Sequence, residues 1–451
     1  MNIIIVGCGK VGQALAQQLG EEDHNITVVD LSAEKVTETT ERYDCMGVVG
    51  NGATLSTLHD AGITDADLMI AVTGSDERNL LCCLIAKKAG DCHTIARVRS
   101  PEYSSEASYL KEELGLAMVI NPEQAAAAEI ARVLQFPSAM KIDTFAKGKV
   151  ELLKFRLPEN SPLAGCTVKE ITTKLHCDVL VCTIERDEDA FIANGDFVFM
   201  EHDIISIIAA PKNAYAFFKK INYKATPVKD VMIVGGGDIT HYLCTLLEHY
   251  GTSVKIIEKN AERCNELSEI LSNATVIHGD AADQDLLLQE GIKSAGAFVA
   301  LTNLDEENVL LSLFAKSMTD GKLVTKVNRI DFESVINHLD LDSIIYPKNV
   351  TSSSIVRYVR AMKGTLNNDV ETLTQIIKGK VEAAEFIIKN SSVLTSKPLK
   401  DLKFKDDVLL AAILRDKKVI LPRGNDIIQC GDSVVVVTTH LQLTDVTEIL
   451  R

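Results

Sequence analysis

The 451-residue sequence has no tryptophan, no long hydrophobic run and no excess of positive charge. Its apolar stretches, such as residues 204–210 and 434–437, fall far short of the ~20 residues that a membrane-spanning helix requires. The formal net charge of −16 argues against binding to a nucleic-acid backbone, because such binding depends on lysine and arginine. No basic segment precedes the first apolar strand, so we expect no signal peptide. These absences predict a globular protein with no nucleic-acid partner and no direct membrane insertion.

The sequence also lacks the motifs of several enzyme and metal-binding classes. No HExxH, Gly-x-Ser-x-Gly or P-loop pattern occurs, and these are signatures of zinc peptidases, serine hydrolases and P-loop nucleotide hydrolases. The 11 cysteines form no CxxC pair, and apart from the adjacent Cys82 and Cys83 they are scattered over apolar segments. We therefore expect reduced, structural cysteines in a cytosolic protein, and no metal site.

A glycine-rich turn follows the first apolar segment of the chain. A strand is expected at Asn2–Val6, where apolar and mostly β-branched residues predict burial. Gly7, Gly9 and Gly12 then follow in G-x-G-x-x-G spacing. In that pattern the first glycine permits a tight turn, the second lets a pyrophosphate approach the backbone, and the third lets helix and strand pack closely. The helix from Val11 onward would direct free N–H groups and its dipole toward a phosphate.

A second apolar strand, at residues 26–29, ends in an acidic residue. Asp30 lies 18 positions after Gly12. A carboxylate there can accept hydrogen bonds from both hydroxyls of an adenosine ribose, and it would repel a 2′-phosphate. Leu31 and Ser32 follow, so no arginine is present to bind such a phosphate. The turn, the helix and the acid together predict a nucleotide site rather than an incidental glycine turn.

The chain repeats this unit at an offset of 228 to 231 residues. VMIVGGGDIT at residues 231–240 matches IIIVGCGKVG at residues 3–12, and Glu258 takes the position of Asp30. Residues 48–81 match residues 276–311, and residues 150–165 match residues 381–396. Each copy is long enough to bury a core of its own, so the repeat indicates a duplicated two-domain unit and not a solenoid.

Within each copy, strands and helices alternate in the pattern of a doubly wound parallel sheet, or Rossmann domain. Shorter alternating strands follow and predict a small α+β domain. We therefore predict an α/β protein of four domains: Rossmann domains at 1–140 and 225–365, each followed by a small α+β domain, at 141–224 and 366–451.

In a doubly wound sheet the ligand crevice lies at the carboxyl ends of the strands. Gly7, Asp30, Asn51, Thr73 and Arg97 all fall at predicted strand ends. The residues expected to bind the nucleotide are Gly7, Gly9, Lys10, Val11, Gly12, Asp30, Leu31, Asn51, Gly52, Ala53, Thr73, Gly74 and Arg97 in the first copy, and Gly235, Gly237, Glu258, Asp280, Ala281 and Thr302 in the second.

The two predicted sites are not chemically equal. Lys10 can neutralise a phosphate, whereas its counterpart Asp238 would repel one. Thr240 replaces Gly12, so we expect it to crowd the contact between helix and strand. We therefore expect the first site to bind a pyrophosphate. The second would bind adenosine weakly, bind a different nucleotide, or serve only a structural role.

The order of the motifs resembles that of a known family. IIIVGCGKVG with Asp30 is followed by VVGNGAT, IAVTGSDERN, IARVRSPEY and INPEQ, and the set recurs in weaker form in the second copy. The whole chain is similar in this order to the TrkA-type regulatory subunits of bacterial potassium-uptake systems, which contain tandem RCK domains (regulators of potassium conductance). The resemblance implies a cytosolic, non-catalytic subunit that binds NAD(H), or ATP or ADP, and gates an integral-membrane potassium-uptake subunit of the TrkH or TrkG type.

The resemblance also implies a homo-oligomer, for which we expect a tetramer. A chain with a net charge of −16 should not bind an anionic membrane surface by itself. We therefore expect a cytoplasmic protein that reaches the inner face of the plasma membrane only through its membrane subunit.

An NAD-dependent oxidoreductase with a duplicated Rossmann domain is the alternative function. Such an enzyme needs a proton donor or acceptor near the nicotinamide, usually a histidine or lysine with an orienting carboxylate. The 10 histidines occupy unrelated positions in the two copies, and His24, His93 and His176 have no counterpart in the other half. The pattern therefore favours a nucleotide sensor over an enzyme.

Overall fold

The computed structural model describes residues 1–146, 148–187, 189–221, 223, 227–328, 335–336, 338–339, 341–363, 368–377, 379–416, 418–441 and 443–451. The chain divides into two compact units. Unit 1 combines Met1–Ala131 with Lys229–Ser352, and unit 2 combines Arg132–Val228 with Ser353–Arg451. Each unit thus contains equivalent parts of both copies of the repeat.

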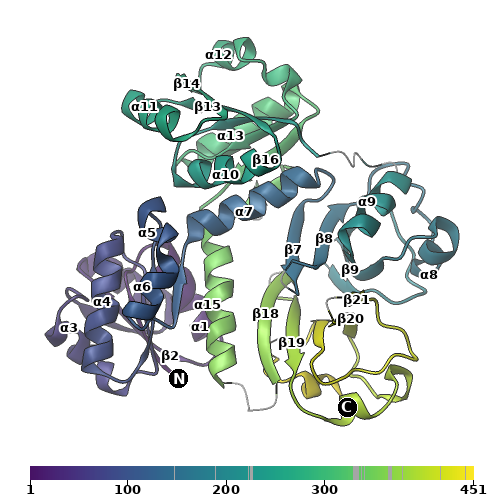
Figure 1. The fold of residues 1–451 in the computed structure, drawn as a ribbon, viewed down its shortest axis with the longest axis horizontal. Helices are drawn as coiled ribbons and strands as arrows, with labels where there is room; N and C mark the ends of the chain where they lie inside the picture. The colour runs from purple at the N-terminus through teal and green to yellow at the C-terminus, as the bar shows by residue number, and fades with distance from the viewer. Residues whose placement is uncertain are drawn as a thin grey trace. The chain divides into compact units, whose positions relative to one another are not determined.

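Unit 1 contains a six-stranded parallel sheet from the first copy, drawn in purple to blue in Figure 1. Its order is β3-β2-β1-β4-β5-β6, the order of a doubly wound sheet. The strands are β1 (Asn2–Val6), β2 (Asn25–Asp30), β3 (Met46–Val49), β4 (Leu68–Ala71), β5 (His93–Arg97) and β6 (Met118–Ile120). The helices are α1 (Lys10–Gly20), α2 (Ala33–Tyr43), α3 (Leu55–Asp60), η1 (Ile63–Asp65), α4 (Asp76–Ala89), α5 (Pro101–Ser105), α6 (Ala107–Glu113) and α7 (Pro122–Gln135).

Local sequence explains where these elements begin. All residues of β1 from Ile3 to Val6 are at most 2% exposed, as expected for a central parallel strand covered on both faces. Helix α2 is capped by Ser32, whose hydroxyl accepts a hydrogen bond from the Lys35 N–H. Helix α4 is capped in the same way by Ser75 and the Arg78 N–H. Such caps satisfy N–H groups that the helix itself leaves free.

The second copy forms an equivalent parallel sheet in unit 1, of order β14-β13-β12-β15-β16-β17. Its strands are β12 (Asp230–Val234), β13 (Ser253–Glu258), β14 (Ala274–His278), β15 (Ala297–Ala300), β16 (Lys322–Lys326) and β17 (Ser343–Ile345). Its helices are α10 (Asp238–His249), α11 (Ala261–Ile270), α12 (Gln284–Gln289), η3 (Ile292–Ser294), α13 (Asp305–Met318) and α15 (Pro347–Lys363). The predicted pair of doubly wound sheets is confirmed.

Unit 2 contains two antiparallel sheets. The first, of order β10-β9-β11-β8-β7, consists of β7 (Lys141–Phe145), β8 (Val150–Arg156), β9 (Leu180–Arg186), β10 (Asp189–Ile192) and β11 (Ile204–Ala209), with α8 (Val168–Glu170), η2 (Ile171–Leu175) and α9 (Pro211–Lys220). The second, of order β18-β19-β22-β20-β21, consists of β18 (Asn368–Ile377), β19 (Val381–Ile388), β20 (Val408–Arg415), β21 (Lys418–Ile420) and β22 (Ser433–Thr438), with α16 (Val393–Ser396), η4 (Leu399–Asp401) and η5 (Val446–Ile449). These are the predicted small α+β parts of the fold.

The two small sheets share one hydrophobic core. Phe145 and Leu152 of the first sheet pack in it with Ala383 and Val435 of the second, and each is at most 1% exposed. The backbone also joins the sheets, since the N–H of Ala146 donates to Glu385 Oε2 at 3.0 Å. These residues of each small sheet are therefore buried against the other sheet, whereas Phe155 and Phe217 belong to a core that the first small sheet forms with its own helices.

The division into four domains remains a prediction. The boundaries at 224/225 and 365/366 lie outside the described residues. Strands β7, β10, β18 and β21 carried no clear sequence signal, and each is an edge strand of its sheet. Edge strands are covered on fewer sides, so their apolar alternation is weak. No helix in the described part of the chain is both long and apolar enough to cross a bilayer.

Two equivalent glutamates of unit 2 lie in different electrostatic settings. Glu382 of β19 is 2% exposed and forms a two-pronged ion pair with Arg360, at 3.0 and 3.2 Å. On β8, burial raises the pKa of Glu151 to about 7, although Arg132 acts to lower it. Glu151 Oε2 is buried without a hydrogen-bond partner among the described residues. The ionised form of Glu151 is therefore poorly stabilised.

We predict that Glu151→Gln stabilises the protein at pH 8 but not at pH 5. The folded-state pKa is raised from 4.5 to about 7, so the unfolded chain loses its proton first, and wild-type stability falls as pH rises through this interval. The amide cannot ionise, so the variant should lose this slope. Thermal unfolding at pH 5, 6, 7 and 8 measures it.

Glu382→Gln is the matched control, because it removes the carboxylate that forms the two-pronged ion pair with the buried Arg360. It should be destabilised at every pH, by about 3–5 kcal/mol. A Glu151→Gln variant with the same pH slope as the wild type would contradict the prediction.

Candidate functional site

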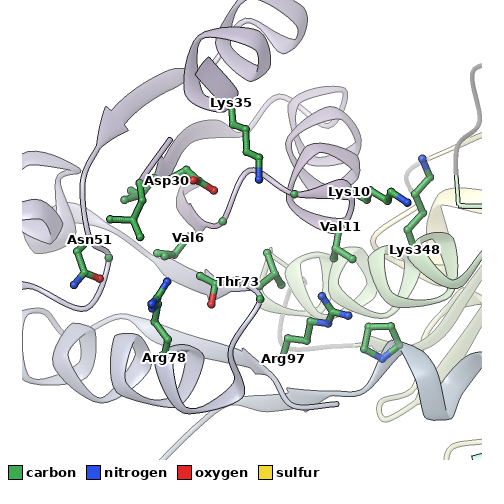
Figure 2. A pocket seen from close by; sticks show the side chains of 18 of the residues that line it. Val6, Lys10, Val11, Asp30, Lys35, Asn51, Thr73, Arg78, Arg97 and Lys348 are labelled. Carbon is green, nitrogen blue, oxygen red and sulfur yellow. The ribbon is translucent and has the colours of Figure 1, made fainter. Parts of the chain in front are cut away.

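A cavity of about 450 Å³ opens at the carboxyl ends of the first parallel sheet. It is lined by residues of both copies: Val6, Gly7, Gly9, Lys10, Val11, Val29, Asp30, Leu31, Lys35, Gly50, Asn51, Gly52, Val72, Thr73, Gly74, Arg78, Arg97, Pro122, Glu123, Asn328, Pro347 and Lys348. Figure 2 shows Asp30 and Asn51 at one end of the cavity and Lys10 and Lys348 at the other. We call these the acidic end and the basic end.

The glycine turn is packed so closely at two of its glycines that a side chain there would clash with backbone atoms. Gly7 has φ +111°, and a Cβ there would lie 3.0 Å from the backbone N of Thr73. A Cβ on Gly12 would lie 1.8 Å from the carbonyl oxygen of Gly7. Gly9 has open space around its Cβ position and caps α1 without a side-chain hydrogen bond. The first N–H groups of α1 therefore remain available to an anion in the cavity.

The Asp30 carboxylate is held by two backbone N–H groups. Its Oδ2 accepts from Cys8 at 2.7 Å and its Oδ1 accepts from Ser32 at 2.9 Å. A carboxylate offers about four acceptor positions, so positions remain for the hydroxyls of a ligand. The bonds fix the direction in which those positions point.

Positive side chains surround the rest of the cavity. Lys10, Lys35 and Arg78 line it, and none of their side-chain nitrogens has an ion pair or hydrogen bond with another residue that the structure describes. In Figure 2, Lys35 and Arg78 point toward the cavity centre from opposite sides. Arg97 pairs with Glu123 at 2.6 Å, but Arg97 Nε is buried without a partner among the described residues. Five cations and two carboxylates line this cavity in a chain of net charge −16, which suits a polyanionic ligand.

A buried asparagine fixes the strand ends that form the cavity floor. Asn79 is fully buried, and its Oδ1 accepts from the Thr73 N–H at 2.8 Å while its Nδ2 donates to the Arg97 carbonyl at 2.9 Å. Asn308 makes the corresponding bonds to Thr302 and Lys326 in the second copy. The carboxyl ends of neighbouring strands are thus held together in both copies.

Most of the predicted first-copy residues are brought together at this cavity. They are Gly7, Gly9, Lys10, Val11, Asp30, Leu31, Asn51, Gly52, Thr73, Gly74 and Arg97. Gly12 and Ala53 do not line it, and Gly12 acts through the packing of α1 on the turn. The six residues predicted in the second copy do not line this cavity and lie instead in the glycine turn and at the strand ends of the second sheet.

Several lining residues were not predicted. Lys35 and Arg78 stand in the first turns of α2 and α4, three residues after the capping serines, and that position is a signal the sequence does offer. Glu123 follows the last strand of the sheet. Asn328 and Lys348 come from the second copy, and no pattern within the first copy points to them.

The second copy reproduces the backbone geometry of the turn. Gly235 has φ +95°, and Glu258 accepts from the N–H groups of Gly236 at 2.6 Å and Asn260 at 2.7 Å. The longer glutamate needs more room than Asp30, and a Cβ on Gly236 would lie 3.0 Å from Glu258 Oε2. The pair Glu258 and Gly236 therefore replaces the pair Asp30 and Cys8 at the same position in the repeat.

The polar side chains of the second copy bind one another. Lys259 Nζ lies 2.6 Å from Asp280 Oδ2, and Arg263 Nε donates to the Gly236 carbonyl at 2.7 Å. Thr240 donates to the carbonyl of Gly235, so it is accommodated by a hydrogen bond where we expected crowding. These contacts occupy groups that the first copy leaves open to its cavity.

The charges that favour an anion are also reversed in the second copy. Asp238 stands at the position of Lys10, and Glu307 at the position of Arg78. At the position of Arg97, burial lowers the pKa of Lys326 to about 8, and its Nζ donates to the carbonyl of Leu301. The second turn therefore lacks two of the positive charges that line the first cavity.

Two family models match the chain, and each matches twice. The TrkA-N domain matches residues 3–122 and 231–347. The TrkA-C domain matches residues 152–222 and 383–451. The matches fall on the two parallel sheets and on the two small sheets.

Curated relatives match along almost the whole chain. The Trk system potassium uptake protein TrkA of Vibrio alginolyticus is 32% identical over 442 residues, covering 96% of this chain and 95% of that protein. TrkA of Halomonas elongata is 33% identical, with the same coverage of 96% and 95%. The TrkA homolog of Archaeoglobus fulgidus is 32% identical over 100% of both chains.

Solved structures share the fold at lower identity. The GsuK channel has a TM-score of 0.65 and 17% identity, over 98% of this chain and 77% of the channel chain. A structure described as the GsuK channel bound to NAD has a TM-score of 0.64 and 16% identity over the same shares of the two chains. These likenesses support the fold only.

We predict that Gly12→Ala destabilises the protein and that Gly9→Ala does not. A Cβ at Gly12 overlaps the carbonyl of Gly7, so α1 or the turn must shift, at a cost of about 1–3 kcal/mol. Gly9 has an extended backbone and no atom within 4 Å of its Cβ position, which makes it the matched control. Thermal unfolding compares the two. Equal melting temperatures would show that α1 can move away from the turn without cost.

Proposed function

Since this chain belongs to the TrkA family, we propose that it is a regulatory subunit that binds NAD(H), or ATP or ADP, in the first cavity and thereby gates an integral-membrane potassium-uptake subunit of the TrkH or TrkG type. The observation that carries the proposal is the cavity itself. Lys10, Lys35 and Arg78 converge on it without ionic partners among the residues that the structure describes, beside an open helix N-terminus. A nucleotide with two or more phosphates would supply the missing negative charge.

The acidic end of the cavity favours an unphosphorylated ribose. Asp30 is oriented by its two backbone bonds and has acceptor positions left for ribose hydroxyls. A 2′-phosphate would face this carboxylate at close range, so we propose NAD(H) rather than NADP(H). ATP and ADP offer the same ribose and pyrophosphate, and the cavity chemistry alone does not separate them from a dinucleotide. Solved relatives of the fold are described as bound to NAD and to ADP.

We propose one phosphate-binding site per chain. The second turn has Asp238 and Glu307 where the first has Lys10 and Arg78, and Arg263, at the position of Lys35, binds the turn itself. The second copy then acts mainly as a structural partner of the first.

No specific observation favours the oxidoreductase alternative. A dehydrogenase needs a group that exchanges a proton near the nicotinamide, usually a histidine or a lysine with an orienting carboxylate. None of the described residues lining the cavity is a histidine, and neither Lys10 nor Lys35 is paired with a carboxylate among the described residues. The relatives reported above are named as potassium-uptake proteins and a channel.

The outer faces of equivalent helices support a homo-oligomer. On α4, Cys82 and Cys83 are buried against the sheet, while Leu81 is 47% exposed on the other side. The counterpart of Leu81 on α13, Leu310, is 67% exposed. A helix that is apolar on both sides is normally covered on both. We propose that α4 of one chain contacts α13 of the next, and that head-to-tail contacts of this kind close a cytoplasmic tetramer beneath the membrane subunit.

We predict that Asp30→Ala lowers the affinity for NADH, NAD, ATP or ADP by about 10-fold or more, because a charged hydrogen-bond acceptor for the ribose is lost. Glu258→Ala is the matched control, since it removes the same pair of backbone bonds from the second turn. It should change the affinity less than twofold. Isothermal titration calorimetry of the full chain measures both.

Equal losses in the two variants would contradict the assignment of one phosphate site. Gating is tested by potassium flux into liposomes that contain the membrane subunit, with and without the regulatory chain and nucleotide. Flux unaffected by nucleotide would contradict the proposed function. Steady-state hydride transfer that co-purifies with the chain would restore the oxidoreductase alternative.

We predict that Leu81→Glu combined with Leu310→Glu dissociates the oligomer, because charge would replace apolar contacts in both outer faces. Light scattering at micromolar concentration should give a tetramer for the wild type and a smaller species for the variant. Leu55→Glu, at a residue of α3 that is 51% exposed, is the control and should leave the tetramer intact. A wild-type monomer at that concentration would refute the assembly.

A further inference from the structure

A tyrosine of the second copy contacts two loops of the first copy within unit 1. Tyr242 lies on α10, the helix that follows the second glycine turn. Its hydroxyl donates to the carbonyl oxygen of Arg99 at 2.8 Å and accepts from Asn121 Nδ2 at 2.9 Å. Burial is the largest cause that raises the pKa of Tyr242, so the hydroxyl keeps the proton that it donates. The hydroxyl thus acts both as a donor and as an acceptor.

The first of these loops supports the cavity wall through its contact with Gly74. The Arg99 N–H donates to Asp76 Oδ2 at 2.9 Å, and the Arg99 guanidinium donates to the carbonyl of Gly74. Gly74 lines the cavity directly after Thr73. A hydrogen bond to the Arg99 carbonyl therefore restrains the residue whose guanidinium holds Gly74.

The second loop, which contains Asn121, leads into the part of the cavity wall formed by Pro122 and Glu123. Asn121 Oδ1 accepts from the Gln124 N–H at 2.8 Å, which fixes the start of α7. The two residues between them, Pro122 and Glu123, line the cavity, and Glu123 pairs with Arg97. Tyr242 thus holds both wall segments near Arg97 without lining the cavity itself.

The first copy has no tyrosine at the equivalent position with which to make the same contact to the second copy. Ala14 of α1 occupies the position of Tyr242 in the repeat and has no polar side-chain atom with which to return the contact. Among the described residues, the hydrogen bonds of the tyrosine go to Arg99 and Asn121, whereas Asp30 at the acidic end is held by Cys8 and Ser32. Its influence on a ligand should therefore be confined to the walls around Gly74, Glu123 and Arg97.

We propose that Tyr242 is a positioning residue for the first cavity, through which the second copy sets the affinity for nucleotides that extend past the glycine turn toward Arg97. The proposal rests on the proposed function, because it requires that the first cavity bind such a nucleotide. It gives the second copy a role at the first site that does not depend on ligand binding by its own turn.

The test compares NADH with AMP on the full-length chain by calorimetry. Tyr242→Phe keeps the ring and removes only the hydroxyl, so NADH affinity should fall by about three- to tenfold, the effect of losing a polar contact. AMP affinity should stay within twofold of the wild type, because AMP ends at the glycine turn. Tyr250→Phe, at an exposed tyrosine that caps the same helix, is the matched control and should change neither.

A double-mutant cycle separates positioning from general destabilisation. In an Asn121→Ala background, Tyr242→Phe should have a smaller effect on NADH affinity than in the wild type, since part of its contact is already gone. Unchanged NADH affinity in Tyr242→Phe, or equal losses for NADH and AMP, would overturn the proposal. A wild-type chain that binds no nucleotide would instead overturn the proposed function, so the two failures are distinguishable.

Discussion

The carboxylate at the end of the second strand determines the geometry of each glycine turn. Asp30 joins three elements at one point, because it is the last residue of β2, accepts from the turn after β1, and accepts from the serine that caps α2. The phosphate-facing helix α1 begins from the turn so held. Glu258 makes the same two bonds in the second copy, where Gly236 provides the space that the longer side chain needs. The same pair of backbone hydrogen bonds therefore forms in both copies, although the acid and the residue of the turn that donates to it differ.

Much of the fold could be predicted from sequence because buried parallel strands and glycine turns leave strong local patterns. The strand at Asn2–Val6 and the repeat of its motif at residues 231–240 led directly to two doubly wound sheets. The edge strands β7 and β18 could not be predicted in this way, since one side of each lacks a neighbouring strand. The core shared by the two small sheets was not predicted. The alternation of apolar residues in a strand indicates that one face is buried, but it does not indicate which sheet covers that face.

Some residues of the candidate site could likewise be predicted from sequence, and others could not. Residues at strand ends, such as Asp30 and Thr73, follow from the order of the sheet and lie where expected. Lys348 and Tyr242 could not be found from sequence, because their relevance depends on how one copy packs against the other within unit 1. Sequence did show the unequal charge of the two turns. It did not show that Arg263 binds the carbonyl of the second glycine turn, or that Lys259 pairs with Asp280.

The shared core of the small sheets has a consequence for how the two copies could diverge. If each copy were a separate chain, the pair would form only by association, and both members would carry the same residues. Covalent linkage makes the partner always present at a high effective concentration, whatever the protein concentration in the cell. It also guarantees that each assembled pair contains one of each half. The two copies could then differ at equivalent positions, as Lys10 differs from Asp238 and Ala14 from Tyr242. A symmetric pair of identical chains would not allow such a difference.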